Sequence, residues 1–409
     1  MRIHRLTAFH VPIALRRPVR HASHERSAND TLIVRCVLDD GSIGWGEGLP
    51  RTYVTGESID SAWRQLEQTD FAVLHDGHFD SPAAAAAAID GFVLADVSPD
   101  AGIVPRECFG NAVRCALELA ILDAVCRCAG MPLGRLISQL PQSSGFADLR
   151  EQVYYSGAIT SESPRKQWLS ALKMRLFGFR QVKVKVGAAG IADADCLRRI
   201  RRVVGSAVDL RLDANEAWRC EELESRLAPL LPFRPSCLEQ PVPHAETPGL
   251  GAIRGRLGIP VMLDESLCCR ADAERAIAGG WCDAFNIRLS KCGGLVRSLE
   301  LVRLAREHGV FCQLGCQVGE TGILSAAGRH FACHVPNLRY VEGSFDRFLV
   351  RDSLVEPDIT FRYGGRGPRL TNPGLGVTVD ECRVRALALR TMELLVPERF
   401  PLTGNAGSR

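Results

Sequence analysis

From about residue 150 onward, the sequence alternates short β-rich runs with amphipathic helical stretches. Eight such runs occur, at Val153–Ile159, Gln181–Val186, Val208–Asp213, Ser236–Glu239, Val261–Asp264, Ala284–Ile287, Phe311–Leu314 and Arg339–Val341. Polar residues near the ends of successive runs recur at intervals of 25 to 30 residues, which is the length of one strand–helix unit. This repeat predicts a parallel sheet, and eight units predict a (β/α)8 barrel of the TIM type within the α/β class.

The residues before this repeat have a different pattern, which predicts a smaller α+β domain. β-rich runs at Thr31–Leu38 and Ile43–Glu47 flank an Asp-Asp-Gly-Ser turn, so a hairpin is expected. A long apolar-periodic helix is expected over Asn111–Cys128, because glycine and proline follow it. The alanine-rich segment 80–105 is expected to be an irregular or helical insertion.

Composition excludes several classes of partner. The chain has 50 Lys and Arg against 47 Asp and Glu, a net charge of +3, which is too balanced for binding nucleic acid or an anionic membrane. Hydrophobic residues make up 46%, as in ordinary globular proteins. No apolar run reaches the roughly 18 residues of a membrane span, and the N-terminal residues lack the apolar stretch of a signal peptide. We therefore expect a cytoplasmic protein.

Cysteine and histidine patterns indicate neither disulfides nor zinc. The 16 cysteines are scattered through apolar segments without a Cys-x-x-Cys pair, so reduced and buried thiols are expected. Cys316 is a candidate for lining a site, because it follows the seventh run. His330 and His334 have the spacing of a zinc pair on a helix, but no Glu follows the first histidine, and a plain helix face is the preferred interpretation.

Three successive runs each end in a carboxylate. Asp213, Glu239 and Asp264 stand at the ends of the third, fourth and fifth runs. In a barrel of this type the carboxyl ends of the strands meet at one mouth, so these side chains are expected to converge there. Such a group needs a cation, and all-oxygen ligation favours Mg²⁺, with Mn²⁺ as a substitute. Any one of them alone would more often be a helix N-cap.

Three lysines are expected to face the same mouth. Lys183 and Lys185 alternate with valines along the second run, which predicts that both point into the barrel. Burial and mutual repulsion should lower the pKa of one of them, so that it can act as a base. Lys291 follows the sixth run and would lie across the mouth. The alternative is an exposed edge strand with solvated lysines.

Together these motifs resemble the muconate lactonizing enzyme subgroup of the enolase superfamily, within its mandelate racemase and muconate lactonizing enzyme family. The motifs that carry the resemblance are Lys183-x-Lys185, Asp213-x-Asn215, Glu239-Gln240-Pro241, Asp264-Glu265-Ser266 and Lys291-x-Gly293-Gly294. Residues 31–57 resemble the capping domain of that family, and residues 372–377 resemble its C-terminal tail. The resemblance implies three parts: a capping domain over 1–148, a barrel over 149–355, and a segment over 356–409 that returns to the cap.

The resemblance also implies roles for the site residues. Asp213, Glu239 and Asp264 would bind Mg²⁺, which stabilises the enediolate formed when a proton α to a carboxylate leaves. Lys185 would be the base on one face of the α-carbon, with Lys183 lowering its pKa, and Lys291 would be the acid or base on the opposite face. Asn215 and Glu265 would orient the ligands or Lys291.

Substrate contacts are expected from the cap loops and the last strand ends. The candidates are His24, Arg26, Tyr53, Gln317 and Glu320, with His21, Arg51 and Cys316 nearby. Dipeptide epimerases carry an Asp-x-Asp after the eighth strand for the substrate ammonium, whereas this chain has Glu342-Gly343-Ser344-Phe345-Asp346. That difference argues against a dipeptide of the L-Ala-Glu type.

The resulting hypothesis is a Mg²⁺-dependent racemase or epimerase of an amino-acid derivative that carries a carboxylate. A muconate-type cycloisomerase or an acid dehydratase on the same scaffold is the alternative. A barrel that binds a carboxylated ligand without turnover is the alternative of another class. A nicotinamide-dependent dehydrogenase is disfavoured, because no glycine-rich fingerprint follows a strand. The family resemblance further implies a homo-oligomer.

Overall fold

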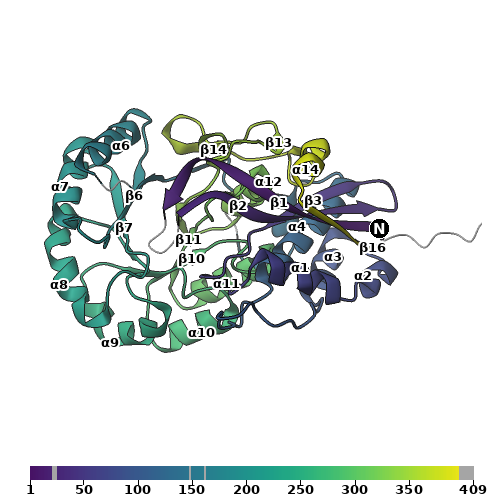
Figure 1. The fold of residues 1–409 in the computed structure, drawn as a ribbon, viewed down its shortest axis with the longest axis horizontal. Helices are drawn as coiled ribbons and strands as arrows, with labels where there is room; N and C mark the ends of the chain where they lie inside the picture. The colour runs from purple at the N-terminus through teal and green to yellow at the C-terminus, as the bar shows by residue number, and fades with distance from the viewer. Residues whose placement is uncertain (21–24, 147–148, 161–162, 396–409) are drawn as a thin grey trace, which may run out of the picture.

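The structure is a computed structural model that describes residues 1–20, 25–146, 149–160 and 163–395. Figure 1 shows a barrel of strands and surrounding helices at one end of the molecule and a layer of long antiparallel strands with its own helices at the other. Among the described residues, no helix is both long and apolar enough to cross a membrane.

Eight parallel strands form the barrel in sequential order. They are β5 (Gly157–Ile159), β6 (Gln181–Lys185), β7 (Asp209–Asp213), β8 (Leu238–Glu239), β9 (Val261–Leu263), β10 (Ala284–Ile287), β11 (Phe311–Leu314) and β12 (Leu338–Val341). The main-chain N–H of Ser156 donates to the carbonyl of Val341 at 2.8 Å, which brings the first and last strands together. The (β/α)8 barrel that the repeat predicts is therefore confirmed.

The first β-rich run differs from the expectation. Val153–Ile159 is not one strand but two, β4 (Gln152–Tyr154) and β5. β4 leaves the barrel because it pairs antiparallel with β14 (Arg366–Pro368) from the C-terminal part of the chain. The other seven runs form barrel strands whose ends differ from the predicted ones by at most two residues.

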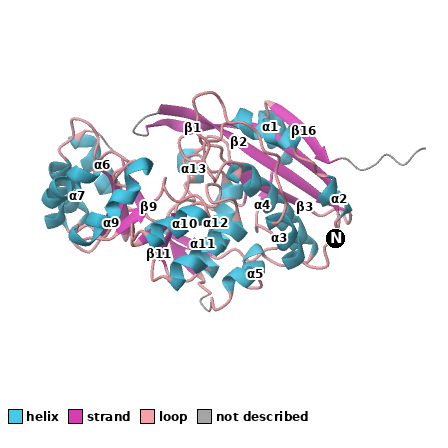
Figure 2. Ribbon diagram, turned by 90° about the horizontal axis from the view of Figure 1, so that it is seen from below, coloured by secondary structure: helices cyan, strands magenta, loops and turns pink. Residues whose placement is uncertain are grey.

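Helices cover the outside of the barrel, as Figure 2 shows from a second direction. They are α6 (Pro164–Leu176), α7 (Asp193–Val204), α8 (Leu223–Leu227), α9 (Leu250–Ile253), α10 (Arg270–Ala278), α11 (Leu295–Glu307) and α12 (Gly322–His334). Short 3₁₀ turns add η2 (Cys220–Glu222), η3 (Ala228–Phe233), η4 (His244–Gly249) and η5 (Arg254–Arg256). Helix α7 is typical, because its buried side chains recur at helical spacing and face the strands.

The second layer is a four-stranded antiparallel sheet in the order β16-β1-β2-β3. Its strands are β1 (Ile3–Arg20), β2 (Glu25–Leu38), β3 (Ile43–Gly48) and β16 (Arg390–Leu395). β2 and β3 form the expected hairpin. β16 pairs with β1, so the C-terminal part of the chain completes the cap. The boundaries at 148 and 355 stay a prediction.

Helices of the cap and the C-terminal segment complete the molecule. They are α1 (Ile59–Gln68), α2 (Ala72–Asp76), α3 (Pro82–Asp90), α4 (Asn111–Cys128), α5 (Leu133–Ile137), α13 (Asp346–Leu349) and α14 (Glu381–Leu387), with η1 (Pro141–Ser143), η6 (Tyr363–Gly365), β13 (Val355–Glu356) and β15 (Thr378–Val379). Helix α4 has the bounds that the sequence predicts. It lies directly on β3, because Gly44, Gly46 and Gly48 have no side chains and a Cβ at each would meet the α4 main chain.

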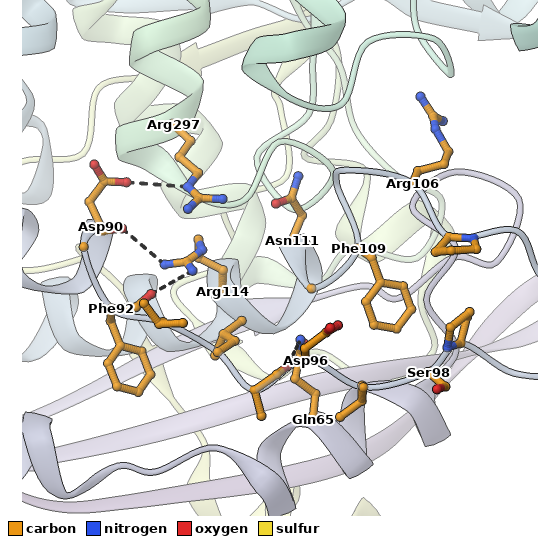
Figure 3. Close-up of a pocket in the computed structure, with 18 residues that line it drawn as sticks. Gln65, Asp90, Phe92, Asp96, Ser98, Arg106, Phe109, Asn111, Arg114 and Arg297 are labelled. Carbon is orange, nitrogen blue, oxygen red and sulfur yellow. Dashed lines mark hydrogen bonds and ion pairs between the residues drawn. The ribbon is translucent and has the colours of Figure 1, made fainter.

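The segment 80–105 is part helix and part irregular chain, as expected. Its first half is α3, and residues 91–105 form loops and turns. With Gln65 of α1 and Arg114 of α4, this segment lines a cavity of about 610 Å³ (Figure 3). Arg114 donates to the main-chain carbonyls of Ile89 and Phe92, so it holds the segment against α4. None of the predicted site residues lines this cavity.

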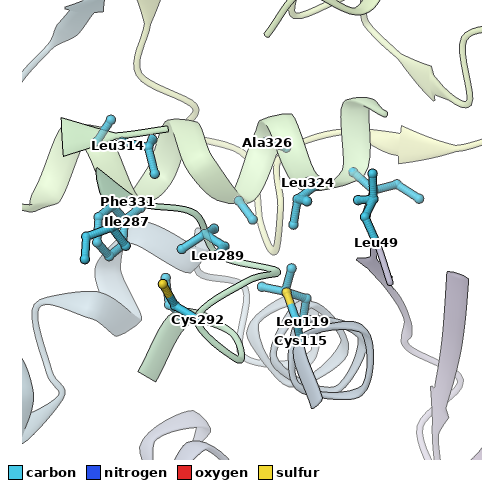
Figure 4. Packing of buried hydrophobic residues seen from close by; sticks show 14 of the residues in the cluster. Leu49, Cys115, Leu119, Ile287, Leu289, Cys292, Leu314, Leu324, Ala326 and Phe331 are labelled. Carbon is cyan, nitrogen blue, oxygen red and sulfur yellow. The ribbon is translucent and has the colours of Figure 1, made fainter. Parts of the chain in front are cut away.

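One hydrophobic core joins the cap to the barrel. Figure 4 shows Leu49 and Leu119 of the cap packing with Leu289, Leu314 and Leu324 of the barrel. The 16 cysteines are free, and most are buried, as expected for reduced thiols. Because both layers share a core, the cap is held at the end of the barrel.

Two buried carboxylates of the cap bind the first turns of barrel helices. Glu47 accepts from the main-chain N–H of Thr321 at 2.9 Å and of Leu324 at 3.0 Å, at the start of α12. Glu118 accepts from the main-chain N–H of Leu295 and Val296, at the start of α11. A carboxylate at a helix N-terminus satisfies free N–H groups and the helix dipole. These contacts fix the cap against the loops that follow β10 and β11.

Candidate active site

Three carboxylates lie at the ends of neighbouring barrel strands. Asp213 ends β7 and Glu239 ends β8, and the two residues are paired in register. Asp264 follows β9, which pairs with β8. Each of the three residues is at most 1% exposed. Sequential strand order therefore places these residues side by side, at the carboxyl ends where the barrel mouth lies.

Lys183 is the common partner of this carboxylate group. Its Nζ lies 2.9 Å from Oε2 of Glu342, 3.2 Å from Oε1 of Glu239 and 3.3 Å from Oδ2 of Asp213. Burial alone would lower the pKa of Lys183, but the carboxylates together raise it well above its usual value. Lys183 therefore remains protonated.

Lys185 has the opposite electrostatics. It ends β6 in register with Asp213, and its side chain is partly exposed. Burial lowers the pKa of Lys185, Asp213 opposes that effect, and Lys183 adds to it. Of the two lysines on β6, Lys185 thus has the lowered pKa that a base needs.

Lys291 follows β10 and reaches the carboxylates from the other side. Its Nζ donates to the main-chain carbonyl of Asp264 at 2.7 Å, to Oδ1 of Asp264 at 2.8 Å and to the carbonyl of Asn286 at 2.9 Å. Burial would lower its pKa, but Asp264 raises it above the usual value. Lys291 is therefore a protonated donor in the turn after β10, and Lys185 is on β6, with β7, β8 and β9 between the two strands.

Arg288 is a site residue that the sequence analysis did not identify. It pairs with Oδ2 of Asp264 and lies 3.9 Å from Oε1 of Glu239. Together with Lys291 it holds the pKa of Asp264 at about 2, against the effect of burial. A signal was available, because Asn286 and Arg288 continue the alternation of inward residues along β10.

The inside of the barrel is a connected polar network. Arg211 donates to Oε1 of Glu342 at 2.9 Å and to the amide oxygen of Gln313. Asn286 donates to Oε1 of Glu239 at 2.8 Å. Glu342 thus has Lys183 on one oxygen and Arg211 on the other, and both lower its pKa although burial raises it. Its charge is already compensated within the protein.

Asn215 and Glu265 lie next to the carboxylates. The main-chain N–H of Asn215 donates to Oδ1 of Asp213 at 3.1 Å, and its φ of 42° is a left-handed conformation that asparagine tolerates. Glu265 is 2% exposed, and its main-chain carbonyl accepts from Arg106 of the cap at 2.7 Å. Main-chain hydrogen bonds thus hold both residues at the barrel mouth.

The predicted substrate contacts are only partly described. His21 and His24 lie outside the described residues, and Arg26 is described only as a backbone position in β2. Tyr53 packs against a small buried cluster of Val54, Cys108 and Cys268.

The loop between β11 and α12 holds the remaining candidates. Gln317 donates from Nε2 to the carbonyl of Leu49 at 3.4 Å and from its main-chain N–H to Glu320 at 2.6 Å. Burial raises the pKa of Glu320 to about 8. Arg51 donates to the carbonyl of Val318 at 3.2 Å. Burial raises the pKa of the Cys316 thiol, with Glu320 and Glu342 adding to it and Arg288 opposing it, so that thiol stays neutral.

The carboxylate oxygens at the barrel mouth are the type of ligand that a hard divalent cation prefers. Three carboxylates at adjacent strand ends supply the oxygen ligands that Mg²⁺ prefers. Within the described part of the chain, however, no three His, Cys, Asp or Glu side chains lie close enough together to hold a metal ion. Lys183 contacts both Asp213 and Glu239, and Arg288 pairs with Asp264, so cations of the protein lie among the carboxylates.

The rings of His330 and His334 have hydrogen-bond partners within the protein. Nδ1 of His330 accepts from the main-chain N–H of Gly134 at 3.2 Å, and Nε2 donates to the carbonyl of Leu375 at 3.1 Å. Both ring nitrogens are used within the core, and burial lowers the pKa of His330 to about 3. The pair is a packed helix face.

Comparisons with known proteins agree with this arrangement. The family model described as Enolase C-terminal domain-like matches residues 169–383. An L-Ala-D/L-Glu epimerase of Bacillus subtilis is 29% identical over 384 residues, which are 92% of this chain and 97% of that protein. A D-Ala-D/L-Ala epimerase of Cytophaga hutchinsonii is 31% identical over 74% of this chain and 76% of that protein.

Solved structures and a cycloisomerase extend the comparison. A dipeptide epimerase of Cytophaga hutchinsonii, solved with Mg and the dipeptide D-Ala-L-Val, has a TM-score of 0.81 at 26% identity and covers 97% of this chain and 100% of its own. Muconate cycloisomerase 1 of Rhodococcus opacus is 27% identical over 91% of this chain and 94% of that protein. The chain therefore belongs to the enolase superfamily, in the branch of mandelate racemase and muconate lactonizing enzyme, whose members named above are isomerases.

Proposed function

We propose that the protein is a Mg²⁺-dependent racemase or epimerase that removes and returns the proton α to the carboxylate of an amino-acid derivative. The observation that carries the proposal is the pair of lysines, Lys185 and Lys291, on opposite sides of a mouth lined by carboxylates. Inversion at a carbon needs one group on each face of that carbon, and these two lysines supply both.

Asp213, Glu239 and Asp264 are the residues that would hold Mg²⁺. When bound, the cation would supply positive charge next to the substrate carboxylate, which stabilises the enediolate anion. Asn215 would orient Asp213 through its main-chain N–H. Glu265 is proposed to orient Lys291.

The two lysines begin a turnover in different protonation states. Lys185 has a lowered pKa, so as the neutral amine it accepts the α-proton on its own face. Lys291 has a raised pKa, so as the ammonium it donates a proton to the opposite face. In the reverse direction the roles exchange. Lys183 transfers no proton, because three carboxylates hold it as an ammonium.

The state of Glu342 bears on the substrate. Both of its oxygens are occupied by Lys183 and Arg211, so it offers no uncompensated charge to a substrate ammonium. This supports an amino-acid derivative that does not depend on a carboxylate after the eighth strand. His24, Arg26, Tyr53, Gln317 and Glu320 are proposed to contact the remainder of the substrate.

The test is α-proton exchange in D₂O with Mg²⁺, followed by NMR across N-acyl amino acids, dipeptides, proline derivatives and acid sugars. Deuterium incorporation with inversion is expected for one of these classes. Conversion to a cyclic or unsaturated product would instead favour a cycloisomerase or a dehydratase, an alternative that the similarity to muconate cycloisomerase 1 keeps in view. Binding of Mg²⁺ with no exchange anywhere would favour a barrel that binds carboxylates without turnover.

Three further properties are part of the proposal. We propose that the protein acts in the cytoplasm, assembles as a homo-oligomer and accepts Mn²⁺ in place of Mg²⁺. Light scattering during gel filtration tests the assembly, and the exchange assay with each metal tests the substitution.

A further inference from the structure

Both carboxylate oxygens of Asp264 are paired with cations of the protein itself. Lys291 donates to Oδ1 at 2.8 Å, and Arg288 pairs with Oδ2. Arg288 also lies 3.9 Å from Glu239, the neighbouring carboxylate. An oxygen that is paired with one cation is a poor ligand for a second, because the two positive charges repel at short distance in a buried site.

Arg288 is held less firmly than Lys291. Lys291 is fully buried and makes three hydrogen bonds of 2.7 to 2.9 Å, two of them to main-chain carbonyls. The Arg288 side chain is 13% exposed, and its Nε is buried without a hydrogen-bond partner in the described part of the chain. Moving Arg288 breaks fewer hydrogen bonds, and part of its side chain is already exposed.

We propose that Arg288 is a positioning residue that serves as the counter-ion of Asp264 and Glu239 while the protein is metal-free and gives way when Mg²⁺ binds. The inference rests on the proposed metal site. The inference predicts two opposite effects of Arg288. It stabilises the metal-free protein, and it weakens Mg²⁺ binding because it competes for the same carboxylate oxygens.

Titration calorimetry with Mg²⁺ separates this role from a purely structural one. Arg288→Met should lower the dissociation constant for Mg²⁺ on the order of tenfold, the size of one charge-assisted hydrogen bond no longer broken on binding. Arg288→Lys keeps the positive charge and should bind Mg²⁺ much as the parent does. Arg303→Met is the matched control, because the Arg303 side chain on α11 is 39% exposed and pairs there with Glu307. A residue that merely supported the ligands would weaken Mg²⁺ binding when removed.

Thermal unfolding supplies a second measurement that needs no turnover. In EDTA, Arg288→Met should unfold at a lower Tm than the parent, and saturating Mg²⁺ should raise its Tm by more. If Arg288→Met does not fold, Arg288→Gln keeps an N–H donor without the charge and takes its place. Unchanged or weaker Mg²⁺ binding in the neutral variant would overturn the inference, as would a parent protein that binds no Mg²⁺. Tighter Mg²⁺ binding in a protein that exchanges no α-proton would support the inference and overturn the proposed function.

Discussion

At the scale of single residues, Lys183 and Lys185 show how neighbouring groups give two lysines on one strand opposite pKa shifts. Both lie on β6, two positions apart, and both face the barrel interior. Lys183 contacts three carboxylates, whereas Lys185 stands at the strand end beside Asp213 and is partly exposed. A buried lysine held by several carboxylates keeps its proton, and for that reason the proposed mechanism assigns proton transfer on this side to Lys185.

Substituting the lysines should separate proton exchange from inversion. In Lys185→Ala, racemisation should fall by about 10²- to 10⁴-fold, while exchange of the enantiomer whose proton faces Lys291 persists. Lys291→Ala should show the opposite preference. NMR of each enantiomer in D₂O measures both effects. Near-normal racemisation in either variant would contradict a mechanism with two bases.

At the scale of elements, two carboxylates of the cap accept hydrogen bonds from the N-terminal ends of barrel helices. Glu47 on β3 accepts from Thr321 and Leu324 at the start of α12, and Glu118 on α4 accepts from the start of α11. Both helices follow strands that end at the active-site mouth. The cap therefore sets the positions of the loops that carry Gln317 and Lys291.

Removing the Glu47 carboxylate should destabilise the protein. Glu47→Ala leaves the main-chain N–H groups of Thr321 and Leu324, at the start of α12, without their buried acceptor, at a cost of about 1–3 kcal/mol. Urea unfolding measures the change. Glu67→Ala removes an exposed glutamate of α1 and should stay within about 0.5 kcal/mol of the parent. Equal stabilities for the two variants would show that Glu47 does not support α12.

His330 on α12 should make stability depend on pH. Burial lowers its pKa from 6.5 to about 3, so the unfolded chain binds a proton in this range and the folded chain does not. Its contribution is present above pH 6.5 and is lost as the pH falls toward 3, by about 1.4 kcal/mol per pH unit. Urea unfolding between pH 8 and pH 5 should therefore show a smaller slope for His330→Gln, whose amide can replace both hydrogen bonds. His308→Gln, at an exposed histidine, is the matched control.

At the scale of the whole molecule, the barrel could be predicted from the periodicity of the sequence. Some side-chain contacts at its mouth could not, because they depend on long-range packing. Alternation along strands indicated that Lys183 and Asp213 face inward, because it depends only on neighbouring residues. The pairing of Arg288 with Asp264, and of Glu342 with Lys183 and Arg211, depends on which strands become neighbours and how far side chains reach. The departure of β4 from the barrel likewise depends on β14, far along the chain.

The shared core predicts that cap and barrel unfold together. Leu119 of α4 is fully buried in the cluster that also contains Leu289 and Leu324 of the barrel (Figure 4). Leu119→Ala should therefore cost about 2–5 kcal/mol and lower the hydrogen-exchange protection of barrel strands as much as that of α4. Val73→Ala, at a side chain that is 70% exposed, should leave both unchanged. The contrary result would be two separate unfolding transitions, in which α4 loses its hydrogen-exchange protection while the barrel strands keep theirs. The cap would then be an independent unit, and the stability of the active-site mouth would come from the barrel alone.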